Sequence, residues 1–207
     1  MKTILMLSGF VILTLASSAQ SNNPYDQRGI DYVSSLKIIT DDYKSGKATS
    51  FSQESLDYYS KTIPLHTTVN TDLVAAVVKT VKGSRFNLVD LINNSSASDF
   101  VKNKLLELYH NSQSLKSKEF QDYLVSAVEN VKGTRAADTD KEIVLTNMSI
   151  AYNSARSNQC EINGIPADSG DCAIVGALGG FVVGLGICGF WCGVGGAVIG
   201  AVVFGLC

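Results

Sequence analysis

The last part of the chain, residues 172–207, carries no charge and is rich in glycine. No Asp, Glu, Lys, Arg or His follows Asp171, and 11 of the chain's 18 glycines lie in this segment. The charged fraction of the whole chain is 17%, below the ~25% of an ordinary soluble domain, and this segment accounts for much of the deficit. A charge-free segment of this length must be withdrawn from water, either in the interior of a fold or in lipid.

Residues 173–206 are too many for one transmembrane helix and suit two shorter ones. A single helix of this length would measure about 51 Å, against a hydrocarbon core of ~30 Å. Two arms, roughly 173–187 and 193–206, would measure about 21 to 23 Å and fall slightly short of a full span. The sequence therefore predicts a helical hairpin.

Glycines recur every four residues within both arms. This interval places small residues on one helix face, where two backbones can approach closely. In water each glycine costs a helix about 1 kcal/mol relative to alanine, whereas in lipid an unpaired backbone amide is so costly that helix is favoured. We expect a membrane-competent packing face with an aromatic residue at the interface: Gly176, Gly180, Gly184, Gly189, Gly193, Gly196, Gly200 and Trp191.

The five cysteines all lie at or after residue 160 and can staple this segment. If the chain reverses between Cys188 and Cys192, antiparallel partners have residue numbers that sum to about 380. That centre pairs Cys188 with Cys192 and Cys172 with Cys207. A disulfide between Cys160 and Cys172, which closes a loop rich in turn residues, is the competing connectivity. Sequence cannot fix the connectivity, although secretion would allow oxidation.

The chain begins in the manner of a secreted protein. Lys2 precedes an apolar run at 4–15, and Ser17 and Ala19 occupy the −3 and −1 places of a peptidase site, which is the pattern of a secretory signal peptide. The run is shorter than the ~20 residues of a membrane helix. We expect residues 1–19 to be removed and the mature chain to be secreted or held in the cell envelope, associated with a membrane through its C-terminus.

Residues 20–156 show the pattern of a helical domain. Apolar residues recur every three or four positions, and breaks rich in Gly, Pro, Ser and Asn separate the runs. A strand competes only at 73–81, where Val and Thr are dense. With a linker at 157–171, the expected fold class is all-α, a helical bundle followed by a glycine-rich hairpin. The expected helices lie around residues 32–43, 50–63, 72–82, 98–110, 118–132 and 139–154, with capping boxes at Ser50 with Gln53 and at Thr139 with Glu142.

Residues 52–85 and 102–135 form a weak internal repeat. Asp72–Arg85 and Asp122–Arg135 are identical at six of 14 positions. Duplicated helix hairpins could bury their apolar faces against each other. Lys and Gly at helix ends are also common enough to produce such a likeness by chance, so both interpretations stay open.

The sequence contains no recognisable catalytic or metal-binding motif. His66 and His110 stand without neighbours at metal-ligand spacing, and the nucleophile elbow, phosphate loop and zinc-protease helix are absent. Two acidic pairs are expected to be helix caps or solvated carboxylates: Asp41 with Asp42, and Asp138 with Asp140. We expect no enzyme activity, metal or cofactor, and a net charge of −2 gives no support for nucleic-acid binding.

Two segments carry a resemblance to known proteins. Residues 172–207 resemble the glycine-zipper membrane segments of class II bacteriocin-like peptides and of bacterial proteins with a glycine-zipper domain. The mature start, Asn-Pro-Tyr-Asp at 23–26 followed by Gly29, resembles the opening of uncharacterised secreted bacterial proteins with a helical domain and a glycine-rich end. The resemblance implies a membrane segment and supplies no catalytic residues. A secretory leader and a large helical domain depart from the bacteriocin pattern.

These observations predict a secreted protein whose helical domain carries or shields a membrane-inserting hairpin. It would act as a bacteriocin-like or contact toxin on a competitor's membrane. The alternative is an envelope-anchored structural or binding module that uses the tail as its membrane anchor. The expected partners are a lipid membrane and further copies of the chain through the glycine-rich tail. A periplasmic enzyme would require a pocket with converging polar groups.

Overall fold

The computed structural model describes residues 22–47, 54, 58–59, 71–81, 86–157 and 171–205. These residues form no strand, which confirms the all-α class and excludes the strand considered at 73–81. The expected signal peptide at 1–19, most of the helix expected at 50–63, and the linker apart from its two end residues lie outside the described part. The described helices are α1 (Asp26–Lys44), α3 (Thr71–Val81), α4 (Leu88–Asn93), α5 (Asp99–Ser114), α6 (Ser117–Lys132), α7 (Asp138–Ser157), α8 (Asp171–Cys188) and α9 (Phe190–Gly205).

Local sequence signals explain several helix ends. Gly46, just after α1, has a φ of +75°, a conformation that glycine adopts without steric cost. The Ser98 hydroxyl accepts a hydrogen bond from the Val101 N–H at the start of α5, and α6 ends at Gly133. The predicted capping box at Thr139 is wrong, because α7 begins at Asp138 and Thr139 lies inside the helix. The Glu142 carboxylate accepts a hydrogen bond from an arginine of α1 instead.

The short helix α4 was not predicted. Its six residues include only two fully buried side chains, Leu88 and Ile92, so the sequence there is too short to display a helical period. Asn87 caps this helix by accepting hydrogen bonds from the backbone of Val89 and Asp90. The helix matters to the architecture because it packs against α8 and α5.

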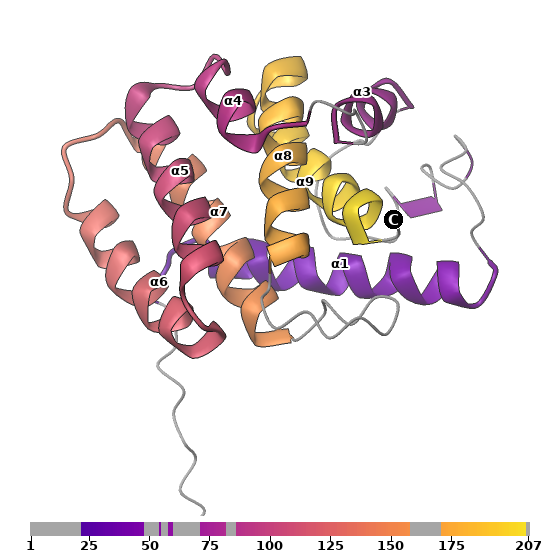
Figure 1. Cartoon of the computed structure of the whole chain (residues 1–207), viewed down its shortest axis with the longest axis horizontal. Helices are drawn as coiled ribbons and strands as arrows, with labels where there is room; N and C mark the ends of the chain where they lie inside the picture. The colour runs from indigo at the N-terminus through magenta and orange to yellow at the C-terminus, as the bar shows by residue number, and fades with distance from the viewer. Residues whose placement is uncertain are drawn as a thin grey trace, which may run out of the picture.

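Helices α8 and α9 occupy the centre of the bundle. Figure 1 shows them, in gold and yellow, with α5 on one side, α3 on the other and α1 crossing below. Helix α8 contacts α3, α4, α5 and α7, and helix α9 contacts α1 and α3. We call residues 171–205 the α8–α9 pair, and we call the other described helices, α1 and α3 to α7, the jacket.

Three apolar clusters join the α8–α9 pair to the jacket. In the first, Leu178 and Val182 pack among side chains of α4 to α7. In the second, Phe181 and its neighbours on the pair pack against α1. In the third, Ile199 packs against the buried face of α3. The pair is therefore covered from several directions by the apolar faces of the jacket helices.

Candidate functional site

Close backbone contacts hold α8 against α9. Three pairs of residues bring the two backbones together: Gly176 with Gly200, Gly180 with Gly196, and Gly184 with Cys192. A Cβ atom added to Gly180, for example, would overlap the carbonyl group of Gly196. In each contact at least one residue lacks a side chain, which permits this approach; small residues pack helices in this way in the absence of a hydrophobic driving force.

The register of this pairing differs from the predicted one. The residue numbers of each close pair sum to 376, so the centre of the antiparallel pairing lies two positions earlier than expected. The reason is the turn, which consists of Gly189 alone, with a φ of +86°, between α8 and α9. Cys192 consequently lies within α9 opposite Gly184, and the predicted centre at a residue sum of about 380 is wrong.

The other predicted packing residues have different surroundings. A Cβ added to Gly193 would meet the ring of Phe181 at 2.9 Å, so this glycine makes room for a side chain. Gly189 has nothing within 4 Å of an added Cβ and serves the turn. Trp191 belongs to α9, but its side chain lies outside the described part.

The predicted disulfides involve side chains that the structure does not describe. Cys192 is disulfide-bonded, and the side chain of its partner lies outside the described part. The pairings Cys188 with Cys192, Cys172 with Cys207, and Cys160 with Cys172 therefore stay predictions.

The turn end of the α8–α9 pair reaches solvent. Gly186 is exposed, and Ile187 keeps 48% of its surface accessible. In contrast, residues 176–182 of α8 and 193–200 of α9 are buried. With 18 residues in α8 and 16 in α9, the helices measure about 27 and 24 Å. Among the residues that the structure describes, no helix meets the length and apolarity that crossing a membrane requires.

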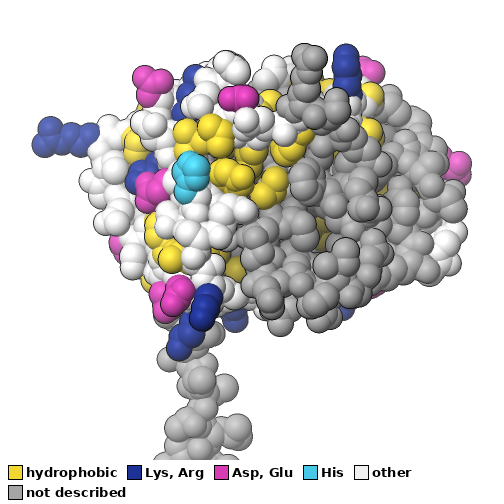
Figure 2. Space-filling model, in the orientation of Figure 1, with side chains coloured by type: hydrophobic (Ala, Val, Ile, Leu, Met, Phe, Trp, Pro, Cys, Tyr) yellow, Lys and Arg dark blue, Asp and Glu magenta, His cyan; other side chains and the backbone are white. Residues whose placement is uncertain are grey.

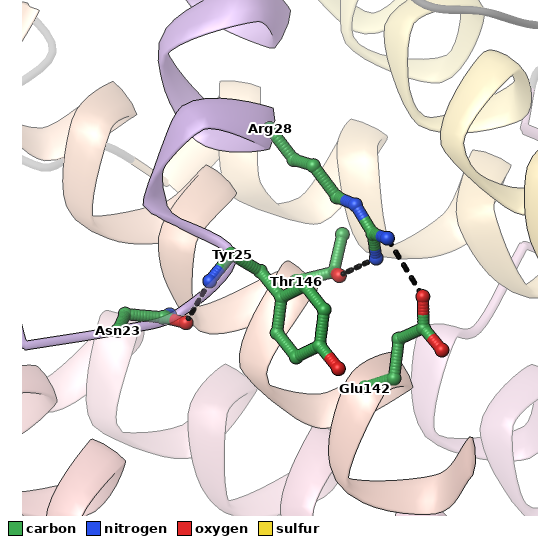
Figure 3. Close-up of polar contacts among 5 residues, drawn as sticks. All are labelled: Asn23, Tyr25, Arg28, Glu142 and Thr146. Carbon is green, nitrogen blue, oxygen red and sulfur yellow. Dashed lines mark hydrogen bonds and ion pairs between the residues drawn. The ribbon is translucent and has the colours of Figure 1, made fainter. Parts of the chain in front are cut away.

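An arginine of α1 connects the jacket to the first residue of α9. One Arg28 nitrogen, Nη2, donates to the Glu142 carboxylate at 2.7 Å, and Nη1 donates to the Thr146 hydroxyl at 2.9 Å (Figure 3). The Arg28 guanidinium lies 4.4 Å from the centre of the Tyr25 ring and 4.8 Å from that of Phe190. It is thus held by charge and by aromatic rings at once.

Polar contacts also seat the start of α1 on α7. The Asn23 side-chain amide donates to the Leu145 carbonyl at 2.7 Å, and its carbonyl oxygen accepts from the Tyr25 N–H (Figure 3). One turn along α1, the Gly29 N–H donates to the Ser149 hydroxyl at 3.0 Å. A Cβ at Gly29 would overlap Ser149, so here too a glycine sets a close helix crossing.

The histidines and acidic pairs singled out in the sequence do not form a reaction centre among the described residues. His110 is exposed, and His66 lies outside the described part. Asp42 is 8% exposed and accepts a hydrogen bond from the Tyr59 hydroxyl at 3.4 Å, so its expected role as a cap or solvated carboxylate is wrong. Asp140 accepts from the Ser98 hydroxyl at 2.7 Å and joins two helix ends.

A second polar cluster links α5 to α6. The Glu107 carboxylate accepts a hydrogen bond from the Tyr123 hydroxyl at 3.0 Å and pairs with the Lys104 ammonium. Burial, followed by the negative charge of Glu107, raises the pKa of the Tyr123 phenol well above its ordinary value. A phenol that keeps its proton in this way is a hydrogen-bond donor that stabilises the jacket.

A shallow cleft of about 350 Å³ lies between the end of α3 and α4, lined by Lys79, Thr80, Phe86, Asn87, Asp90, Leu91 and Asn94. The described residues contain no group of three or more His, Cys, Asp and Glu that could hold a metal ion. In Figure 2 the hydrophobic side chains of the described surface gather over α4, α5 and α8.

Arg28 is the residue that sequence reasoning missed. Its partners Glu142 and Phe190 lie more than a hundred residues away along the chain, so no local pattern reveals the contacts. The one available signal is the spacing of Tyr25 and Arg28, which places an aromatic ring and a guanidinium on the same face of a helix.

No family model, curated protein or solved structure matches this chain.

Proposed function

We propose that the protein is a secreted, membrane-perturbing effector that stores a glycine-zipper hairpin, the α8–α9 pair, inside a helical jacket. The observation that carries the proposal is the combination of three close backbone contacts between α8 and α9 with a segment that has no charged residue after Asp171. The pattern resembles that of bacteriocin-like membrane segments, and its expected partner is a lipid bilayer.

The two kinds of contact made by the pair respond differently to lipid. Apart from the contact of Arg28 with Phe190, the three clusters that join the pair to the jacket are apolar, and they are driven by the exclusion of water. Lipid tails are equally apolar and would replace them at little cost. The contacts between Gly180 and Gly196 and their neighbours depend on close packing of backbones, which persists in lipid. A bilayer would therefore separate the pair from the jacket without separating α8 from α9.

The length of the two helices fits a shallow insertion. At about 27 and 24 Å they are shorter than a hydrocarbon core of ~30 Å. Helices with this mismatch thin the bilayer locally or associate with one another. Both responses weaken the permeability barrier, which is the activity expected of a membrane-perturbing effector.

Dye release from lipid vesicles tests the proposal, and the chain offers a matched pair of variants. Ile187 at the turn of the α8–α9 pair is 48% exposed, and Ile30 on α1 is 42% exposed. Lysine is therefore tolerated at both positions in the folded chain. A charge costs about 2.5–3.5 kcal/mol at the centre of an inserted helix, and less near its end.

We expect the wild-type mature chain to release dye from vesicles of phosphatidylcholine and phosphatidylglycerol. Ile187→Lys should reduce the rate by about tenfold, the equivalent of ~1.4 kcal/mol, whereas Ile30→Lys should leave it within about twofold of wild type. Equal rates for the two variants would contradict the role of the α8–α9 pair. No release by wild type or either variant would contradict membrane activity altogether.

A further inference from the structure

The α8–α9 pair is covered on one side by α1, and α1 is also attached to α7. Tyr32, Leu36 and Ile39 of α1 are buried in one cluster with side chains of the pair that include Phe181 and Val194. The seat of α1 on α7 includes hydrogen bonds and a glycine crossing, and Ile150 of α7 packs in the same apolar cluster. When the seat opens, water can replace its hydrogen bonds at modest net cost.

Arg28 joins these two attachments. Its guanidinium is fixed on the α7 side by Glu142 and Thr146 (Figure 3) and faces the ring of Phe190 on the other. Phe190 in turn meets the ring of Phe181 edge to face, with centroids 6.2 Å apart. Phe181 is fully buried, so a continuous series of contacts leads from α7 through Arg28 into the pair.

The side chains of this connection are only partly withdrawn from water. Arg28 keeps 21% of its side-chain surface exposed and Glu142 keeps 32%. A half-buried arginine and carboxylate can part without leaving a charge stranded in an apolar interior, which is the step that makes a fully buried ion pair hard to break. The contacts of Arg28 therefore have a defined geometry and can still be broken.

We propose that α1 is a releasable cover of the α8–α9 pair and that Arg28 is the latch that keeps it closed. The proposal rests on the function proposed above, and it identifies how that site is regulated. When the Arg28 contacts open, α1 leaves α7, and the apolar face beneath Tyr32, Leu36 and Ile39 becomes available to lipid. The closed state keeps this face away from water while the protein travels.

The test compares Arg28→Ala with a matched control, Arg156→Ala. Arg156 also lies over an aromatic ring, that of Tyr152 on its own helix α7, at 5.6 Å. Each variant loses an arginine that lies over an aromatic ring, but only Arg28 contacts α9 and pairs with Glu142. Dye release from vesicles of phosphatidylcholine and phosphatidylglycerol is recorded for full-length mature protein, with circular dichroism confirming the helical fold of each variant.

We expect Arg28→Ala to release dye about tenfold faster than wild type, since a tenfold change in an equilibrium matches the loss of one charge-assisted hydrogen bond. Arg156→Ala should stay within about twofold of wild type. Phe190→Leu provides a second route, because it removes the ring that faces Arg28 and leaves the hydrogen bond to Glu142 in place. It should accelerate release by about threefold, and combining it with Arg28→Ala should add less than the product of the two effects.

Three results would overturn the latch. The first is dye release by Arg28→Ala and Phe190→Leu at the wild-type rate, which leaves the membrane function standing. The second is equal acceleration by Arg28→Ala and Arg156→Ala, which indicates general loosening of the jacket. The third is the absence of release by wild type and every variant while all remain helical, which removes the proposed membrane function and the latch with it.

Discussion

Two helix crossings in this protein use glycine to bring backbones together, and they differ in the groups that surround the glycines. At the crossing of α1 and α7, Gly29 lies against Ser149, and hydrogen bonds surround the contact. At the crossing of α8 and α9, glycines of α8 lie against two glycines and the backbone of Cys192 in α9, and no charged residue is present after Asp171. Polar groups contribute to the first crossing beside the apolar packing of Ile150, whereas the second depends on close backbone packing.

The difference indicates which crossing each solvent can open. The hydrogen bonds between α1 and α7 are buried, and when the crossing opens, water can take the place of each partner at small net cost. Lipid supplies no group that competes for a backbone contact such as that of Gly180 with Gly196, so the contact persists. The chain thus combines a cover that aqueous surroundings can loosen with a core pair that a bilayer can accept whole.

The largest expected effect is a difference in stability between alanine substitutions at two glycines of the same helix. Gly180→Ala places a methyl group against the Gly196 carbonyl, and overpacking of this kind should lower the free energy of unfolding by about 3 kcal/mol. Gly186→Ala meets nothing within 4 Å and should raise it by about 0.5–1 kcal/mol through helix propensity. Urea unfolding of both variants measures the two values, and the same sign for both would contradict the close packing of α8 against α9.

The polar crossing should respond less strongly. Gly29→Ala brings a methyl group against Ser149 and should cost about 2 kcal/mol, because part of the strain can be relieved by moving α1 away from α7. Gly133→Ala, where an added Cβ meets its nearest atoms at 3.6 Å, is the control and should change stability by no more than about 0.5 kcal/mol. Thermal unfolding monitored by circular dichroism compares them, and an unchanged Gly29→Ala would refute the close crossing.

The smallest effect concerns the jacket away from both crossings. Tyr123→Phe removes the hydrogen bond to Glu107 and should cost about 1 kcal/mol at neutral pH. Because burial raises the pKa of the Tyr123 phenol, the folded chain keeps a proton that the unfolded chain loses above pH ~10. Stability from this group is therefore complete below about pH 10 and declines as the pH rises beyond it.

The variant should accordingly lose less stability than wild type between about pH 9 and 11. Tyr109→Phe on the neighbouring helix α5 serves as the control, and thermal unfolding across this range gives the comparison. An equal alkaline loss in wild type and Tyr123→Phe would show that other groups govern the alkaline stability of the jacket.

Most of the helices could be predicted because they are long enough to repeat. Apolar residues recur at helical spacing over 11 residues or more in each of α1, α3, α5, α6 and α7. This length is sufficient to distinguish a period of 3.6 residues from a period of two. Helix α4 has six residues and shows no period. The capping box at Thr139 failed because Glu142 bonds to Arg28, a tertiary contact that overrides the local one.

The candidate site likewise has one part that the sequence predicts and one part that it does not. An interval of four between glycines is a local signal, and the sequence therefore pointed to Gly176, Gly180 and Gly184. The register between α8 and α9 depends on the length of the turn at Gly189, and one residue more or fewer shifts every pair. Contacts such as that of Arg28 with Phe190 arise only when separate helices meet, so no single segment of the sequence carries a signal for them.

The most direct test of the central claim uses the chain's one tryptophan, Trp191 in α9. Its fluorescence can be recorded while the full-length mature protein is mixed with vesicles whose lipids carry bromine atoms on the acyl chains, which quench only groups that enter the hydrocarbon region. If the α8–α9 pair leaves its jacket for the bilayer, the emission of Trp191 is quenched, and Ile187→Lys reduces the quenching. Emission that stays unchanged in brominated and ordinary vesicles alike would contradict the account.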